Sequence, residues 1–278
     1  SSIKDWINDL LANTPDFVAD DIIPTLEIQI TGVHNEDFIS FSTSFNTDSE
    51  HYFNITVADG FRHNGIGGSG FIARNNSSNG YHFLARNNHI HLDWLEITGK
   101  DGQNQVVYQS QNTTITNSII HDIGRDVSDT GVVIETALIY GLSDRFILNS
   151  SSLINATVYA PEPSGDFNGD RVFRRCYCEN VYLYHDHDKV QLNAFDTCTG
   201  DYNAALAMTS GTPGSNSVII ADDSDLVDPD NFDFRIKSTS PLATAGSGGG
   251  RIGAYYEESA GSGVTTDVDV ELSAPLFN

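Results

Sequence analysis

The chain has 278 residues and a formal net charge of −24, from 38 acidic against 14 basic residues. This negative field repels phosphate backbones and anionic lipid surfaces, which argues against nucleic-acid binding and membrane association. No run approaches the roughly 18 apolar residues of a spanning helix, so we expect no membrane span. Abundant Asn, Ser, Thr, Asp and Gly favour short strands joined by tight turns over a helical bundle.

The first residues place their apolar side chains at the spacing of one helical face. These residues are Ile3, Trp6, Ile7, Leu10 and Leu11. Ser2 is positioned to cap the helix, with Asp5 in the reciprocal capping position and Pro15 ending it. One amphipathic helix ahead of a long β region predicts a cap on the open end of a sheet stack.

Short alternating runs follow the helix. Residues 26–30 and 52–57 have the period of strands. Residues 60–80 are rich in Gly and Asn, which predicts turns. No lysine and no helix follow these glycines, so a phosphate-binding loop is not expected.

From residue 88 onward a strand-and-turn unit recurs. Anchoring the units on Leu92, Ile115, Ile147 and Phe173 gives a repeat of about 23 to 32 residues, within the range of solenoid repeats. Strands at that period with no helix between them predict a parallel β-solenoid, whose stacked coils share one core. An antiparallel sandwich is the alternative, but it has no reason to repeat its sequence.

Polar residues recur where the coils turn. Asn117 and Asn149 each precede a serine, and we expect them at equivalent corners of the solenoid. Longer repeats are coils with a loop grown out of a turn, such as residues 160–165.

The end of the chain has a more specific pattern. The segment DFRIKSTSPLATAG…RIGAYY resembles the closing coil of many secreted and phage-encoded right-handed parallel β-helix proteins. The stretches IKDWINDLLANTPDFVADD and GFIARNNSSNGYHFLARNNHIHLDWLEITG are similar to the solitary β-helix proteins of tailed phages and prophages, which have a pectate-lyase-like fold. The resemblance covers most of residues 1–256 and departs from the usual pattern at Thr244 and Tyr256, where Asp and Glu are common.

The resemblance implies an all-β chain that forms a single right-handed parallel β-helix. We assign residues 1–20 to an N-terminal capping helix and its lead-in, and residues 21–256 to the solenoid. Residues 257–278 form a C-terminal extension, with a flexible Gly/Ser link and then one alternating strand. The strand has no partner nearby in sequence and is expected to bind a sheet edge of another protein. Its anchoring residues are Val268, Val270, Leu272, Leu276 and Phe277.

Candidate catalytic residues gather in one short stretch. Asp186 and Asp188 would share a strand face, with His185 and His187 on the other face. Glycoside cleavage needs two carboxylates that flank one bond, which this pair could supply. A solvated acidic face explains these residues equally well, and the fold alone assigns no activity. Further outward candidates are His121 with Asp122, and Asp93 with Glu96.

Two other chemistries have weaker signals. A lyase would need a basic residue in a groove, for which Arg174 and Arg175 are candidates. Asp166, Asn168 and Asp170 form the start of a calcium loop, but Tyr177 stands where such a loop needs glutamate. This segment is therefore either a Ca²⁺ site or an ordinary turn. In both cases we expect a function that requires no cofactor.

Tyrosines and cysteines complete the candidates. Tyr182 and Tyr184 share one strand face, so both rings either stack on a glycan outside or pack in the core. Cys176 and Cys178 also share a face, and with Cys198 they are expected to be buried thiols. One disulfide is the alternative in an oxidising location.

These observations favour a non-enzymatic structural protein on a virion surface or outside the cell. The expected form is a capsid decoration or a tail-associated spike that attaches through its C-terminal strand to other virion proteins or to copies of itself, and that contacts host surface polysaccharide. A polysaccharide-degrading hydrolase or lyase on the same fold is the first alternative. A bacterial surface adhesin is the second.

Overall fold

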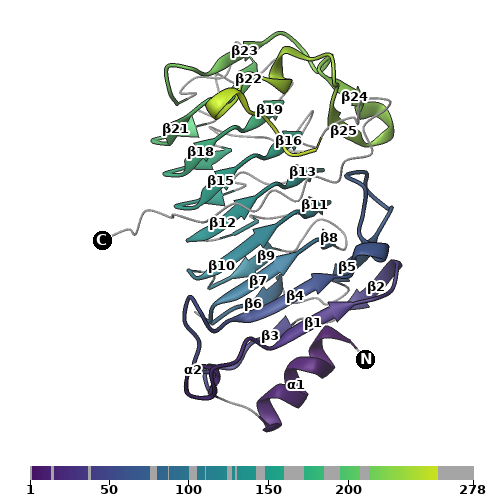
Figure 1. The fold of residues 1–278 in the computed structure, drawn as a ribbon, viewed down its shortest axis with the longest axis vertical. Helices are drawn as coiled ribbons and strands as arrows, with labels where there is room; N and C mark the ends of the chain where they lie inside the picture. Colours follow the sequence, from purple (N-terminus) through teal and green to yellow (C-terminus); the bar gives the residue numbers. More distant parts are fainter. Residues whose placement is uncertain are drawn as a thin grey trace.

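A computed structural model describes residues 2–13, 16–36, 39–75, 80–86, 88–99, 105–109, 111–123, 127–128, 130–141, 148–159, 172–184, 195–206 and 213–255. In these residues the chain forms a parallel β-solenoid, with its coils stacked along one axis (Figure 1). The predicted solenoid is confirmed, because every pairing within the stack is parallel and joins strands of successive coils.

Three sheets run along the stack. Sheet 1 consists of β1 (Thr25–Ile28), β4 (Phe53–Val57), β7 (Ile90–Asp93), β10 (Thr113–Thr116), β12 (Val132–Glu135), β15 (Ser152–Ile154), β18 (Tyr177–Glu179) and β21 (Thr199–Asp201). Sheet 2 consists of β2 (Gly32–Glu36), β5 (Phe71–Asn75), β8 (Glu96–Thr98), β11 (Ile119–His121), β13 (Leu138–Tyr140), β16 (Thr157–Tyr159), β19 (Tyr182–Tyr184), β22 (Ala204–Leu206) and β23 (Val218–Ile220).

Sheet 3 forms the remaining side in two groups. They are β3 (Ile39–Ser40), β6 (Tyr81–Leu84) and β9 (Gln105–Tyr108), then β14 (Leu148–Asn149), β17 (Phe173–Arg174) and β20 (Phe195–Asp196). Ser128 bridges Val107 of the first group to Leu148 of the second, which makes this side continuous. Strand β5 lies within the stretch predicted as turns. That prediction is wrong for residues 71–75, where pairing with β2 and β8 prevails over local composition.

Helix α1 (Ile3–Asn13) lies at the N-terminal end of the stack, as predicted (Figure 1). The reciprocal cap is present: Asp5 N–H donates to Ser2 Oγ at 3.1 Å, and Ser2 N–H donates to Asp5 Oδ2 at 3.0 Å. The helix buries its Ile3 and Ile7 side chains against the inner core. A second short helix, α2 (Phe17–Asp20), follows. No helix in the described residues is long and apolar enough to cross a membrane.

The observed pairing of strands in successive coils agrees with the predicted repeat at its first step and differs from it at its last. Leu92 pairs with Ile115, as predicted. Phe173, however, pairs with Leu148 in sheet 3, so the anchoring mixed two sides of the solenoid. Ile147 lies outside the described residues. The true successors of Ile115 along sheet 1 are Ile134, Leu153 and Cys178.

The corner between sheets 1 and 2 has a constant backbone form. One residue after each sheet 1 strand of the middle and upper coils adopts a left-handed conformation, with φ from +48° to +59°. These residues are Trp94, Asn117, Thr136, Asn155, Asn180 and Tyr202. Asn tolerates this conformation better than most residues, and Asn180 Nδ2 donates to Asn155 Oδ1 in the coil below at 3.0 Å.

Asn149 does not lie at this corner. It belongs to β14 in sheet 3, so the expected equivalence of Asn117 and Asn149 is wrong. Each coil presents similar Asn/Ser turns on more than one side, and the sequence pattern alone does not tell these sides apart.

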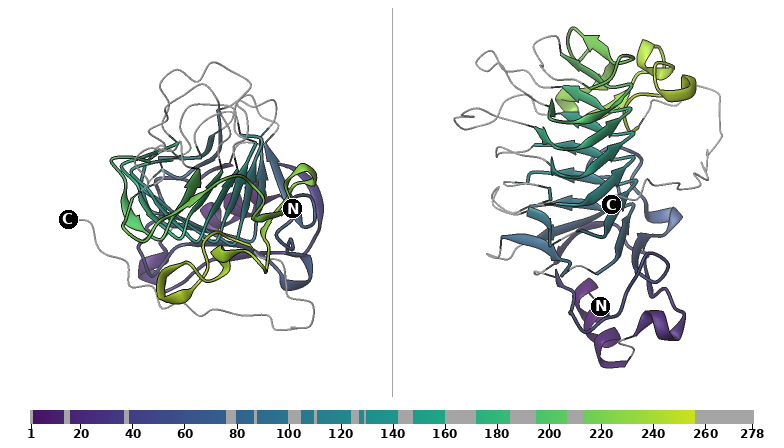
Figure 2. Two further views of the ribbon diagram at one scale, coloured as in Figure 1. Left: turned by 90° about the horizontal axis from the view of Figure 1, so that it is seen from above. Right: turned by 90° about the vertical axis from the view of Figure 1, so that its left-hand side faces the viewer.

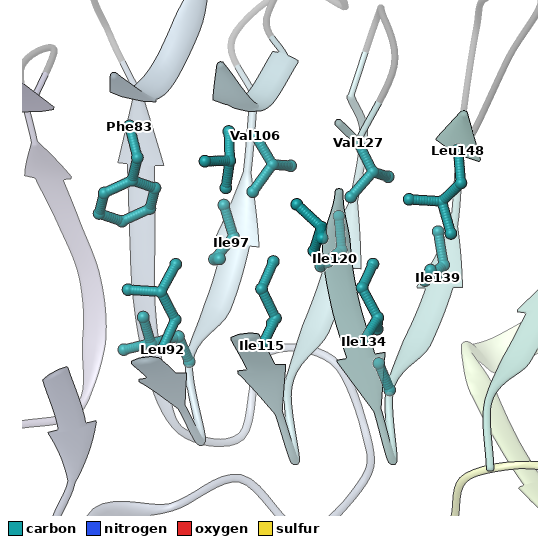
Figure 3. Close-up of a cluster of buried hydrophobic side chains, with 14 of the residues drawn as sticks. Phe83, Leu92, Ile97, Val106, Ile115, Ile120, Val127, Ile134, Ile139 and Leu148 are labelled. Atoms are coloured by element: carbon teal, nitrogen blue, oxygen red, sulfur yellow. The ribbon is translucent and has the colours of Figure 1, made fainter. Parts of the chain in front are cut away.

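The inner core fills the solenoid between the three sheets (Figure 3). Ile115 and Leu148 are fully buried, which confirms both as core residues. Their neighbours are also aliphatic or aromatic, and each buried side chain contributes about 1.5–3 kcal/mol through removal from water. The labelled members are Phe83, Leu92, Ile97, Val106, Ile115, Ile120, Val127, Ile134, Ile139 and Leu148.

A second core lies on the outer face of sheet 2. Residues 226–255, here the closing segment, pack against that face instead of adding another coil (Figures 1 and 2). The segment contains the antiparallel hairpin of β24 (Leu226–Asp228) and β25 (Asp233–Ile236). Short 3₁₀ turns accompany it at Pro229–Asn231, Pro241–Ala243 and Ser247–Gly249, and another lies earlier in the chain at Asp59–Phe61.

The closing segment ends by running back along the corner residues toward the N-terminal coils. Gly253 N–H donates to Asn180 O at 2.8 Å, and Ala254 N–H donates to Thr157 Oγ1 at 2.9 Å. The Tyr255 hydroxyl then donates to Thr136 O at 3.2 Å. The segment is therefore attached to several successive coils.

Candidate functional site

Most sequence-derived candidates lie outside the described residues and stay predictions. The set comprises the catalytic candidates His185, Asp186, His187 and Asp188, the calcium-loop residues Asp166, Asn168 and Asp170, and the anchoring residues Val268, Val270, Leu272, Leu276 and Phe277. Among the described residues, no group of three or more His, Cys, Asp or Glu side chains is arranged to hold a metal ion.

Tyr182 and Tyr184 lie on β19 and face away from the inner core, yet both are buried. Their side chains belong to the second core beneath the closing segment, with exposures of 0% and 8%. Tyr184 stacks on Tyr159, with ring centroids 5.0 Å apart. Stacking on a sugar needs an open ring face, and the closing segment covers these two rings. The sequence left two alternatives for these rings, on the outer surface or in the core. In the structure the rings point outward from the solenoid and are nevertheless buried.

Glu96, His121 and Asp122 form a linear array on the outer face of sheet 2. His121 Nε2 lies 2.8 Å from Glu96 Oε1, and Nδ1 lies 2.9 Å from Asp122 Oδ2. Glu96 is 1% exposed, and its two oxygens also accept the Gly68 N–H at 2.9 and 2.8 Å. The His121 ring stacks on Tyr140, with centroids 4.8 Å apart.

This array is saturated by its own contacts. Burial lowers the pKa of His121, but hydrogen bonds to Asp122 and Glu96 outweigh burial and raise it to about 9. The imidazolium fills the space between the two carboxylates, so no substrate bond can lie between them. The geometry is that of a partly buried ion pair that ties β8 to β11.

Asp93 forms a separate polar cluster on the outer face of sheet 1. Its carboxylate accepts hydrogen bonds from Thr56 Oγ1 at 2.9 Å, Thr116 Oγ1 at 2.7 Å and Asn117 Nδ2 at 2.9 Å. His91 Nε2 lies 2.7 Å from the Thr116 hydroxyl, and burial lowers the pKa of this histidine. Asp93 and Glu96, paired as candidates from sequence, lie on different sheets either side of the corner.

The coil register brings together another pair of carboxylates that the sequence analysis missed. Glu179 and Asp201 are partners on β18 and β21, both on the outer face of sheet 1. Adjacent strands lie about 4.8 Å apart, so the two carboxylates project side by side from neighbouring backbone positions. The Tyr177 hydroxyl donates to Glu179, and this bond raises the pKa of Tyr177 to about 12. The sequence analysis would have identified this pair only with the correct pairing of strands in successive coils.

Asp201 is itself held by backbone and side-chain donors. Its Oδ1 accepts the N–H groups of Tyr202 and Asn216, both at 2.8 Å, and its Oδ2 accepts Asn216 Nδ2 at 2.6 Å. Burial raises the pKa of Asp201, but these hydrogen bonds outweigh it and leave the pKa below its usual value. An ionised carboxylate beside a second one is compatible with a nucleophile and an acid, and equally with a structural link to the loop at Asn216.

The basic candidates lie on another side. Arg174 belongs to β17 of sheet 3, with Nε 3.9 Å from Asp196, and Arg175 takes a left-handed conformation at the next corner. A cavity of about 150 Å³ lies at the N-terminal end of the solenoid. It is lined by Lys4, Ile7, Asn8, Ile39 and Ser40. None of the outward carboxylates described above lines that cavity.

Comparisons with known proteins do not assign a family. No protein-family model matches the chain, and no curated protein matches its sequence.

Proposed function

We propose that the chain is a non-enzymatic structural protein of a virion surface, a capsid decoration or tail-associated spike, that attaches through its C-terminal segment. The observation that carries the proposal is the completeness of the solenoid at Tyr255. The Tyr255 hydroxyl bonds Thr136 O, and its ring lies against Gly65, where an added Cβ would come within 2.9 Å of it. The closing segment is therefore fastened to the coil stack up to its last described residue.

In this proposal the segment 264–278 pairs with a partner protein. Val268, Val270 and Leu272 alternate with acidic residues, the pattern of a strand with one apolar face. A strand that adds to an edge of a neighbouring sheet satisfies its backbone and places the apolar side chains in pockets. The internal saturation of the Glu96 array and the burial of Tyr182 fit a rigid display scaffold. Host polysaccharide would then contact other parts of the surface.

Truncation after Glu258 tests the proposal. The isolated truncated chain should keep its strand-dominated circular dichroism and its unfolding midpoint, while its copy number in purified particles should fall to background. A full-length variant with Val268→Asp, Val270→Asp and Leu272→Asp should fail in the same way. The matched control, with Asp267→Asn, Asp269→Asn and Glu271→Gln on the other face, should assemble. Normal incorporation of the truncated chain would exclude the C-terminal anchor.

The polysaccharide-degrading enzyme remains the second candidate, because Glu179 and Asp201 are neighbours on the outer face of sheet 1, which the described closing segment does not cover. The structural proposal predicts no turnover of host-surface polysaccharide by the isolated chain. Turnover that Glu179→Gln and Asp201→Asn each abolish, at an unchanged unfolding midpoint, would favour the hydrolase. An adhesin would show polysaccharide or surface binding with no copies in particles.

A further inference from the structure

The three cysteines occupy one site in two successive coils. Tyr177 pairs with Thr199, so Cys176 and Cys198, each one residue earlier, occupy equivalent positions just before β18 and β21. Cys178 pairs with Gly200. The three residues are free thiols in the structure, with Cys176 and Cys178 buried in the inner core and Cys198 partly exposed against it.

A direct contact joins the two equivalent residues. The Cys176 backbone N–H donates to Cys198 Sγ at 3.4 Å. Cys176 Sγ in turn lies 3.3 Å from Arg174 O and 3.6 Å from Leu148 O. Cys198 Sγ makes the matching contact in its own coil, 3.6 Å from Asp196 O, so the two thiols occupy equivalent surroundings in adjacent coils.

This arrangement separates the acidities of the three thiols. Hydrogen bonds from Cys176 and Cys178 lower the pKa of Cys198 to about 4, whereas the same bonds and burial raise the pKa values of the other two. Strands β20 and β21, which flank Cys198, are the last described strands of sheets 3 and 1. The most acidic thiol is therefore also the most accessible of the three.

We propose that Cys198 is a site of thiol–disulfide exchange with low-molecular-weight disulfides, and that the product is a Cys176–Cys198 disulfide joining two successive coils. The equivalent positions of the two residues in adjacent coils carry this inference. Disulfides need Cα atoms about 4.4–6.8 Å apart, and directly stacked strand positions lie about 4.8 Å apart.

The reaction balances with the disulfide reagent as oxidant. The Cys198 thiolate attacks one sulfur of the reagent, its S–S bond breaks, and one reagent thiolate leaves and takes up the proton that Cys198 had lost. Cys176 then loses its proton and attacks Cys198 Sγ in the mixed disulfide. The second reagent thiol leaves with that proton. Two cysteine thiols are oxidised to one disulfide, and one reagent disulfide is reduced to two thiols.

The bridge would fasten the coil that contains β20 and β21 to the coil below it. In sheets 1 and 3 this coil is the last one described, so its β20 and β21 have a strand neighbour on one side, while its β22 also pairs with β23. A covalent link there reduces the freedom of the unfolded terminal coil. The chain would be reinforced in an oxidising location, and the inference is independent of whether the chain belongs to a virion.

Incubation of the full chain with oxidised glutathione tests the proposal. Thiol titration of the denatured protein should fall from three thiols to one, and mass spectrometry should find Cys176 joined to Cys198, with fragment ions that place the free thiol on Cys178. A bridge that contains Cys178, or three thiols unchanged, would overturn it. This measurement needs no variant.

Variants sharpen the result. Cys178→Ser, the matched control, should still form the bridge and keep no free thiol. Cys176→Ser should stop at a mixed disulfide of glutathione with Cys198, and Cys198→Ser should take up no glutathione under the same conditions. Circular dichroism of each reduced variant establishes that it is folded. Glutathione on Cys176 or Cys178 in the folded Cys198→Ser variant would contradict the assigned order of reaction.

Discussion

Sheets 1 and 2 have the same alternation of inward and outward side chains and the same stacking of strands. Their outer faces differ in how far another segment covers them. The outward positions of sheet 1 are mostly polar, with the aliphatic Val133 and Ile154 among them and partly exposed, and nothing among the described residues folds over them as the closing segment does over sheet 2. The outward positions of sheet 2 include Leu138, Tyr140 and Tyr182, which are buried beneath that segment. An outward position in a solenoid therefore predicts exposure only where no other segment is folded onto it.

The comparison separates two cores within one domain. The inner core forms by coil stacking alone, whereas the second core requires the closing segment to dock. Substitutions in the second core should release the closing segment before the coils unfold, and substitutions in the inner core should unfold the coils directly.

Phe234→Ala should have the largest effect. Phe234 is 2% exposed, and its ring centroid lies 4.8 Å from Tyr140 and 4.5 Å from Tyr159. Removal of a buried phenylalanine ring costs about 3–5 kcal/mol. Urea unfolding with tyrosine fluorescence measures the loss. Phe232, two residues earlier and 57% exposed, is the control, and Phe232→Ala should cost less than about 1 kcal/mol. Equal losses would mean that the second core is not as described.

Ile115→Ala should destabilise the coils by about 2–5 kcal/mol, because it opens a cavity in the inner core. Thr114→Ala, on the opposite face of β10, should change the free energy of unfolding by less than about 0.5 kcal/mol. A loss below that value for Ile115→Ala as well would show that the inward register of β10 is wrong.

The Glu96–His121–Asp122 array predicts a pH dependence. The folded pKa of His121, about 9, lies above its usual 6.5, so protonation stabilises the folded state. This contribution is complete below the usual pKa and is lost as pH rises through about 9, with an upper bound on the order of 3 kcal/mol. The difference in unfolding free energy between wild type and His121→Gln should shrink from about pH 6 to about pH 10. A constant difference would contradict the ion pair.

Thr116→Val should have the smallest effect. The variant removes the hydroxyl that donates to Asp93 and contacts His91 Nε2, and it costs about 1–2 kcal/mol, the net value of one or two hydrogen bonds. Thr114→Val at the other outward position of β10 serves as the matched control for the change in shape. Equal unfolding midpoints of the two variants would show that the Asp93 cluster contributes nothing measurable.

Local patterns were sufficient for part of the fold. The α1 helix with its Ser2 and Asp5 cap, the strands near residues 26 and 53 and the solenoid class all follow from periodicity and capping chemistry within a few residues. The coil register followed only from Leu92 to Ile115, because the anchor Phe173 resembles a sheet 1 residue in sequence although it pairs with Leu148 in sheet 3. Register depends on which coils stack, and inserted loops of unequal length hide that from a fixed period.

The site residues show the same division. The sequence correctly placed Tyr182 and Tyr184 on one face, but it contained no information on the closing segment that covers them. Glu179 and Asp201 come from different coils, so their pairing appears only once the register is known. The Cys176–Cys198 equivalence was missed for the same reason.

Hydroxyl-radical footprinting of the full chain tests the central claim most directly, because it reports the solvent access of individual tyrosines. Tyr177 lies on the outer face of sheet 1 and is partly exposed among the described residues, whereas Tyr182, five residues later, lies beneath the closing segment. The account predicts rapid modification of Tyr177 and protection of Tyr182 and Tyr184, with the protection lost in Phe234→Ala. Modification of Tyr182 at the rate of Tyr177 in the wild-type chain would show that the closing segment does not cover sheet 2.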